Sequence, residues 1–144
     1  MKQYMGIKLV EAEPHLRVDE PGYLVRYADG YESWSPKATF ESAYLPLVCN
    51  PNLKTNAPSI SQEMVDDFIH HVEVTTLGDK CTVVRAVLRN GFEIVESSAC
   101  VSAENYDEKL GAKICMKKIR DQIWMLLGFL LQTAVNGVNG VNKV

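Results

Sequence analysis

The chain has 144 residues, of which 47% are hydrophobic, enough for one domain with a core or one domain with a small added module. Its formal charge of −3 argues against a general nucleic-acid-binding protein, which would carry a basic face. There is no apolar run of transmembrane length, no typical signal peptide, and no metal-site spacing among the four cysteines. These features predict a reduced cytoplasmic protein.

Residues 1–46 are predicted to form a small, aromatic-rich ββα module. Alternating apolar residues and turn signals predict strands at 5–11, 22–27 and 31–34. Ser35 followed by Pro36 is typical of a helix N-cap with proline in the first turn, so a short helix should follow. The aromatic rings could stack a base or a peptide, but large rings more often fill the core of so small a module.

Residues 47–60 contain proline and asparagine without an apolar period, and they are predicted to be a linker. Ser59 or Ser61 should then cap a helix with an apolar stripe. We expect His70 and His71 to end this helix, because cations near a helix C-terminus favour its dipole. Adjacent histidines on a helix point about 100° apart, so they would not form a metal pair.

The main domain is predicted to span residues 61–135 and to contain an antiparallel meander followed by one long helix. Its strands are expected at 72–76, 81–88 and 92–98. The Asn-Gly dipeptide at 90–91 is the strongest short signal for a hairpin between the last two strands. The predicted class is therefore α+β, with an antiparallel sheet packed by a C-terminal helix and a small N-terminal ββα module.

The long helix is predicted over residues 106–133, with Asn105 as the N-cap of a capping box. Its last turns are apolar nearly all round, so we expect a second subunit to cover them in a homo-oligomer. Gly111 and Gly128 either allow a close approach or weaken the helix locally. The repetitive tail at 136–144 is predicted to fray.

The sequence contains no nucleophile elbow, no Walker loop and no dinucleotide fingerprint, so we expect a binding protein without cofactor or metal and not an enzyme. Cys100 paired with a histidine is conceivable as a nucleophile, but a buried structural cysteine is the more common case. Asn90 and Phe92 at the hairpin, Asn105 and Arg120 would suit a nucleotide, which needs a ring, an amide and a cation. A solvated basic helix face explains the cations equally well.

Four motifs carry a family resemblance. They are an Asn-Gly-Phe hairpin at 90–92, a Ser-Ala-Cys-Val strand at 98–101, an Asn-Tyr-Asp-Glu helix start at 105–108, and Trp124 near the end of a Lys/Arg-rich helix. With these motifs, the chain from about 61 to 131 resembles a family of small tailed-phage proteins. That family includes the first type of Thoeris anti-defence proteins. Those proteins bind cyclic ADP-ribose isomers made by bacterial TIR enzymes without cleaving them, and some also hold cyclic oligonucleotides at separate sites.

The resemblance implies a phage-encoded sponge in the cytoplasm of the infected bacterial host, with C-terminal helices that pair between subunits. Phe92 would stack the adenine, Asn105 or Asn90 would read its edge, and Arg120 would pair with the pyrophosphate. The hairpin tip and the helix start would then line one pocket. Neither membrane association nor general nucleic-acid binding is expected. The alternative is a protein-interaction adaptor that uses the exposed helix end and the aromatic N-terminal module, with binding dependent on Trp34.

Overall fold

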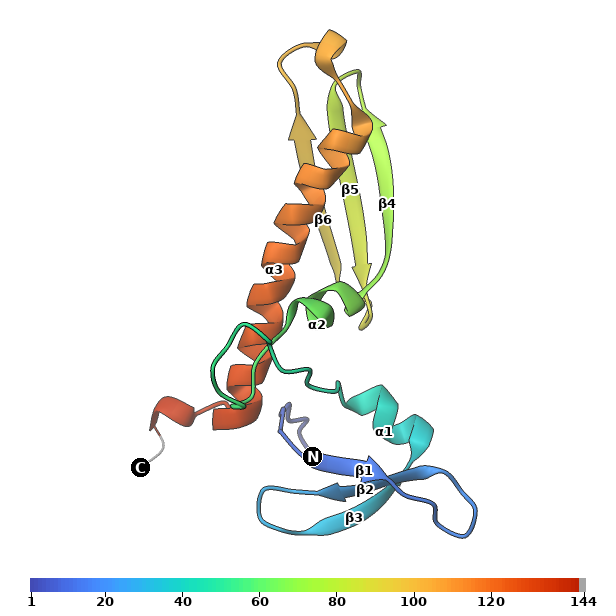
Figure 1. Ribbon diagram of the computed structural model, residues 1–144, viewed down its shortest axis with the longest axis vertical. Helices are drawn as coiled ribbons and strands as arrows, with labels where there is room; N and C mark the ends of the chain where they lie inside the picture. The colour runs from blue at the N-terminus through green and yellow to red at the C-terminus, as the bar shows by residue number, and fades with distance from the viewer. Residues whose placement is uncertain (143–144) are drawn as a thin grey trace. The chain divides into compact units, whose positions relative to one another are not determined.

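The computed structural model describes residues 1–142 and divides the chain into two compact units (Figure 1). One unit contains Met1–Leu47 and the chain from Phe129 onward, and the other contains Val48–Gly128. Each unit has its own three-stranded antiparallel sheet, with the order β1-β2-β3 in the first and β4-β5-β6 in the second. The predicted α+β class is confirmed.

The N-terminal sheet and its helix are held together largely by aromatic side chains. The elements are β1 (Glu11–Pro14), β2 (Gly22–Arg26), β3 (Glu32–Pro36) and α1 (Lys37–Ala43). Tyr23 of β2 stacks on Phe40 of α1 with ring centroids 4.3 Å apart, and Phe40 stacks on Tyr44 at 4.7 Å. Val25 beside them is fully buried. The rings therefore pack on one another and join the helix to the sheet, as expected for so small a module.

Two local predictions in this module are wrong. No strand forms over residues 5–10, and the first strand is β1, which ends with Pro14 opposite Tyr23. A proline is tolerated there because β1 is an edge strand, where a missing N–H costs no ladder bond. Ser35 does not cap α1, since it pairs with Tyr23 inside the sheet. The cap position belongs to Pro36, which offers no side-chain hydrogen bond.

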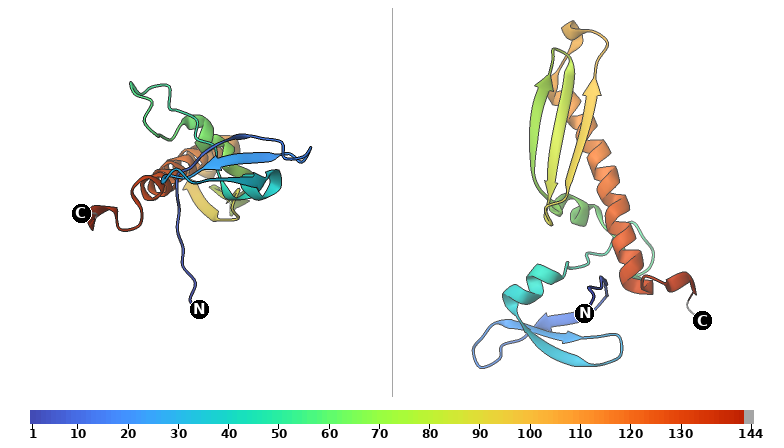
Figure 2. Two further views of the ribbon diagram at one scale, coloured as in Figure 1. Left: turned by 90° about the horizontal axis from the view of Figure 1, so that it is seen from below. Right: turned by 180° about the vertical axis from the view of Figure 1, so that it is seen from behind.

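In the second unit, α3 lies along one face of the sheet (Figure 1, Figure 2). The elements are α2 (Gln62–Asp67), β4 (Ile69–Leu77), β5 (Cys81–Leu88), β6 (Glu93–Ala99), the 3-10 turn η1 (Ala103–Asn105) and α3 (Glu108–Asn136). Strand β5 has the predicted bounds, and its alternation is confirmed because the buried side chains are Thr82, Val84, Ala86 and Leu88. The predicted cap of α2 is confirmed at Ser61, whose hydroxyl accepts the N–H of Met64.

Every fourth residue of α3 is buried along most of its length, namely Gly111, Cys115, Ile119, Ile123 and Leu127. Gly111 lies so close to β5 that a Cβ there would fall 2.1 Å from the Thr82 hydroxyl oxygen. The hydroxyl of Tyr106 bonds both Thr82, at 2.8 Å, and Thr76 of β4, at 2.7 Å. The start of α3 is therefore fixed to the sheet by close backbone approach and by a shared hydroxyl network. Gly128 has no such neighbour.

The prediction that His70 and His71 end a helix is wrong. Helix α2 stops at Asp67, and both histidines belong to β4. The chain leaves the helix because Ile69 pairs with Leu88 in the sheet, with a bulge between Ile69 and His71. Pairing with β5 therefore overrides the local helical pattern.

Both ends of α3 also differ from the prediction. Asn105 is not the N-cap, because it ends η1, and the Asp107 carboxylate accepts the N–H groups of Lys109 and Leu110 at 2.9 and 3.2 Å. At the other end, Gly137 adopts a φ of 80° and its N–H bonds the carbonyl of Thr133. A 3-10 turn, η2 (Gly140–Asn142), follows in the described part of the tail. Residues 143–144 of the predicted frayed tail lie outside the described residues.

Candidate functional site

Three of the four predicted ligand-binding residues share one end of the sheet β4-β5-β6. The β5–β6 turn carries Asn90 and Phe92, and the N–H of Arg89 donates to the Phe68 carbonyl just after α2. Arg120 of α3 forms an ion pair with Asp66 of α2. We call this region, made of α2, the β5–β6 turn and Arg120, the α2 end.

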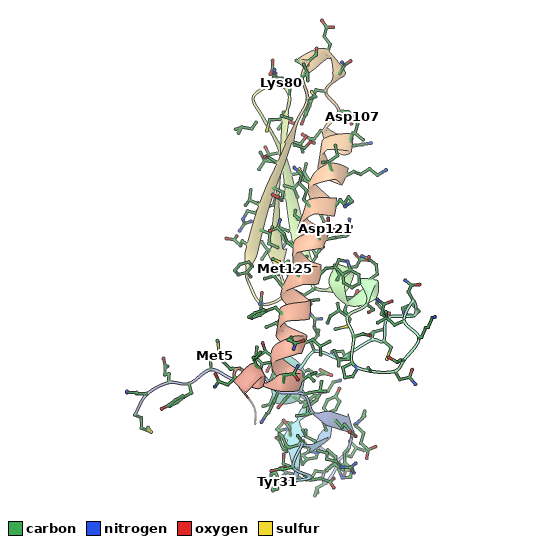
Figure 3. All side chains as sticks on the ribbon, turned by 90° about the vertical axis from the view of Figure 1, so that its left-hand side faces the viewer. Met5, Tyr31, Lys80, Asp107, Asp121 and Met125 are labelled. Carbon is green, nitrogen blue, oxygen red and sulfur yellow. The ribbon has the colours of Figure 1, made fainter. Side chains whose placement is uncertain are left out.

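The 3-10 turn η1, which contains Asn105, lies at the opposite end of the sheet, because the chain just before it bonds to Lys80 in the β4–β5 turn (Figure 1). Figure 3 shows Lys80 and Asp107 together at that end, with Asp121 farther along α3. The eight residues of β5 separate the two ends by about 25 Å at the usual rise of a strand. One chain therefore does not bring Asn105 to Phe92, and the pocket predicted between the hairpin tip and the helix start does not form within one copy.

The hairpin at the α2 end presents the exposed ring of Phe92 next to the side-chain amide of Asn90, whose oxygen is already hydrogen-bonded within the turn. The Asn90 side-chain oxygen accepts the N–H of Phe92 at 3.0 Å, and Gly91 has a φ of 88°. This is the local hydrogen bonding expected of asparagine in a tight turn. Only the Asn90 amide nitrogen is left to donate to a ligand. The residue Phe92 is 55% exposed, so its ring is available for stacking.

Arg120 is oriented by α2. Its Nε donates to Asp66 Oδ1 at 3.0 Å, and the Gln62 amide nitrogen donates to the same oxygen at 3.1 Å. Both charged side chains of the pair are close to half exposed, so an approaching anion can reach the Arg120 guanidinium. The role of Asp66 was missed from the sequence because 54 positions separate it from Arg120. Locally it is an acid near a helix start, where the dipole explains it equally well.

The histidines and cysteines do not assemble a reactive group. The bulge in β4 brings His70 Nδ1 within 2.7 Å of His71 Nδ1, and both side chains are exposed. Residues 1–142 contain no group of three or more potential metal-binding side chains. Cys100 lies next to Lys80 at the η1 end, so the imagined pairing of Cys100 with these histidines is not formed. Burial raises the pKa of the Cys115 thiol, which keeps it neutral and unreactive.

Two small hollows in the described residues lie in the N-terminal unit. One, of about 120 Å³, is lined by residues of β1, β2 and β3, and the other, of about 160 Å³, lies around the loop between β1 and β2. Sites for small molecules usually have volumes of roughly 300–1,000 Å³. Neither hollow is therefore large enough for a nucleotide. No helix in the described part of the chain is both long and apolar enough to cross a membrane.

A model of the Phage protein (N4 Gp49/phage Sf6 gene 66) family matches residues 60–135. The matched segment is more than half of the chain and contains α2, the sheet β4-β5-β6 and nearly all of α3. The N-terminal sheet lies outside it. No curated protein and no solved structure matches the chain. By this match, the chain belongs to the phage protein family of N4 Gp49 and phage Sf6 gene 66.

Proposed function

We propose that this phage protein is an anti-defence sponge that binds and sequesters cyclic ADP-ribose isomers, and thereby blocks TIR-based Thoeris signalling in the cytoplasm of the infected host. The observation that carries the proposal is the α2 end, where an exposed Phe92 ring, the Asn90 amide and the Arg120 guanidinium lie within the family-matched domain. The motif resemblance over residues 61–131 supplies the ligand class, which could extend to cyclic oligonucleotides.

The chemistry of these side chains suits cyclic ADP-ribose, which presents an adenine and a pyrophosphate. Stacking of an adenine on Phe92 would contribute roughly 1–3 kcal/mol. Arg120 would make charge-assisted hydrogen bonds to a pyrophosphate through its terminal nitrogens. The Asn90 amide nitrogen would donate to the base edge. None of these groups is placed to break a bond in the ligand, so binding without turnover is the expected outcome.

A homo-oligomer through the C-terminal helix is part of the proposal. Leu110, Ile114 and Met125 of α3 are 57%, 43% and 67% exposed. If two copies of α3 ran antiparallel about a two-fold axis between positions 119 and 120, Ile114 would face Met125 of the partner subunit. Lys118 would face Asp121 of the partner subunit. Apolar and charged positions would thus meet complementary ones.

The test of oligomerisation is the mass in solution, measured by light scattering after size-exclusion chromatography. Met125→Glu should reduce the mass to that of a monomer, because it places a charge in the proposed contact. Lys113→Glu changes a charge on the same helix outside the paired positions, and it should leave the mass unchanged. A wild-type protein that is monomeric at all concentrations would contradict the proposed pairing.

Ligand binding is tested by thermal shift with a panel of cyclic ADP-ribose isomers and cyclic di- and trinucleotides. A true ligand at a hundredfold excess over its dissociation constant stabilises the protein by about 2.7 kcal/mol. Phe92→Ala should reduce this shift, whereas Tyr4→Ala, which truncates an exposed aromatic ring outside the α2 end, should not. The ligand released by heat should be intact. Recovery of a cleaved product, or no shift with any compound, would contradict the sponge.

The second candidate is an adaptor that binds a protein through the N-terminal sheet. Val18 and Asp19 form a hairpin tip with φ values of 47° and 66°, and Val18 is 95% exposed with Leu16 beside it at 65%. A β-branched residue at positive φ is strained, and such strain is concentrated at functional sites. The Trp34 ring is held against the module, because its Nε1 donates to the backbone carbonyl of His15 at 2.9 Å. Loss of a captured partner in Val18→Asn, which tolerates positive φ, would favour this candidate.

A further inference from the structure

The ion pair of Asp66 and Arg120 has a one-sided geometry. From this geometry we infer that Asp66 is a positioning residue for Arg120, an inference that rests on the proposed function. It holds the guanidinium from the side, so that the two terminal nitrogens are presented to the pyrophosphate or another anionic part of the ligand. Asp66 does not itself touch the ligand in this assignment.

The contact uses only the Nε of Arg120, which lies 3.0 Å from Asp66 Oδ1. Arginine has five N–H donors, one on Nε and four on the terminal nitrogens. Among the described residues, the terminal nitrogens of Arg120 have no hydrogen-bond partner. Those nitrogens form the edge that binds a phosphate with two parallel hydrogen bonds. The carboxylate therefore occupies one donor and leaves the phosphate-binding edge free.

Asp66 is itself held in place. The Gln62 amide nitrogen, one turn earlier on α2, donates a hydrogen bond of 3.1 Å to the same Oδ1. Helix α2 is fixed by the Ser61 cap and by burial of Met64 and Val65. A long arginine side chain loses rotamer entropy when a ligand immobilises it, and a side chain that is already held loses less. The arrangement prepares Arg120 for binding in advance.

The same pair could act in the opposite way, with Asp66 competing against the ligand for Arg120. A competing carboxylate would be expected on the terminal nitrogens, where the phosphate would bind, and it lies on Nε instead. The two possibilities predict opposite changes when Asp66 is removed. Positioning predicts weaker ligand binding, whereas competition predicts tighter binding, because a negative charge near the anion has been removed.

The experiment measures dissociation constants by calorimetry for the panel compound with the largest thermal shift, and by NMR titration for inorganic pyrophosphate, which probes the anion subsite alone. Asp66→Ala should weaken both about tenfold. Asp66→Asn keeps the acceptor oxygen and should bind within about threefold of the wild type. Asp67→Ala, which removes a neighbouring exposed carboxylate of α2, should leave both constants unchanged.

Arg120→Lys separates positioning from simple charge. A lysine keeps the positive charge but has no planar edge of two nitrogens to bind the phosphate while a third nitrogen holds the carboxylate, so this variant should bind more weakly than the wild type. Adding Asp66→Ala to Arg120→Ala should have no further effect, because the aspartate acts only through the arginine. The Nε–H signal of Arg120 in NMR should be protected in the wild type and lose protection in Asp66→Ala.

The outcomes separate this inference from the proposed function. The positioning role is overturned if Asp66→Ala binds as tightly as the wild type or more tightly. It is also overturned if Asp67→Ala loses as much ligand affinity as Asp66→Ala. If the affinity for pyrophosphate depends on Asp66 and Arg120 while no cyclic nucleotide binds, the sponge function is overturned and the positioning role stands. If the wild type binds neither compound, both are overturned.

Discussion

Replacing Gly111 by alanine should destabilise the packing of α3 on β5, although alanine is the better helix former. An ideal Cβ at this position would lie 2.1 Å from the hydroxyl oxygen of Thr82 and 2.7 Å from its Cβ. Thr82 is fully buried and its hydroxyl is bonded to Tyr106 at 2.8 Å. The side chain therefore cannot turn aside without breaking that bond, and the helix must move away from the strand.

The expected loss is about 2 kcal/mol of unfolding free energy. Overpacking a core typically costs about 1–3 kcal/mol, and two contacts below 3.0 Å indicate the upper part of that range. The higher helix propensity of alanine offsets about 1 kcal/mol of this overpacking cost. Gly128 is the matched control, because an added Cβ there meets nothing within 4 Å. Gly128→Ala should therefore raise the unfolding free energy by roughly 0.5–1 kcal/mol.

Urea unfolding followed by circular dichroism measures both changes, provided that the slopes of the transitions agree. Thr82→Ala removes the nearer of the two clashing atoms. In a double-mutant cycle, Gly111→Ala should therefore cost less in the Thr82→Ala background, with a coupling of about 1 kcal/mol. If Gly111→Ala were as stabilising as Gly128→Ala, the close approach of α3 to β5 would be refuted.

The remaining predictions concern the start and the buried thiol of α3. Asp107→Ala should cost about 1 kcal/mol in urea unfolding as the loss of an N-cap, whereas Asn105→Ala should cost far less. Tyr106→Phe should cost about 1–3 kcal/mol, because it leaves the buried Thr82 hydroxyl without its partner. Burial raises the pKa of Cys115, so the folded protein holds this proton more tightly than the unfolded chain. The contribution of this thiol to the free energy of unfolding is therefore complete below the ordinary thiol pKa, and it declines as pH rises from that value through the raised pKa of Cys115. The Cys115→Ala variant should show a smaller decline in the free energy of unfolding between about pH 7 and about pH 10.

Several features were predictable because neighbouring residues decide them. The Asn90-Gly91 turn needs a left-handed glycine between two apolar runs, and Gly91 has that conformation. The alternation along β5 gives one buried face, and the cap of α2 needs only a serine before the first turn. The family-matched segment is built mainly from such local signals, so its sheet and long helix could be inferred from the order of its residues.

The candidate site was less predictable, because its parts come from different segments. The sequence identifies Asn90, Phe92, Asn105 and Arg120 as chemically suitable, but not their positions. The fold places Asn105 about one strand length from Phe92.

Local patterns were enough to predict the Asn90-Gly91 turn, the alternation of β5 and the long apolar helix, because hydrophobic periodicity and turn chemistry act over a few residues. The three-dimensional fold was needed to show that His70 joins a strand, that Gly111 contacts Thr82, and that Arg120 pairs with Asp66. Those outcomes depend on ladder pairing and side-chain contact between distant segments, and no local pattern records which distant partner will be present.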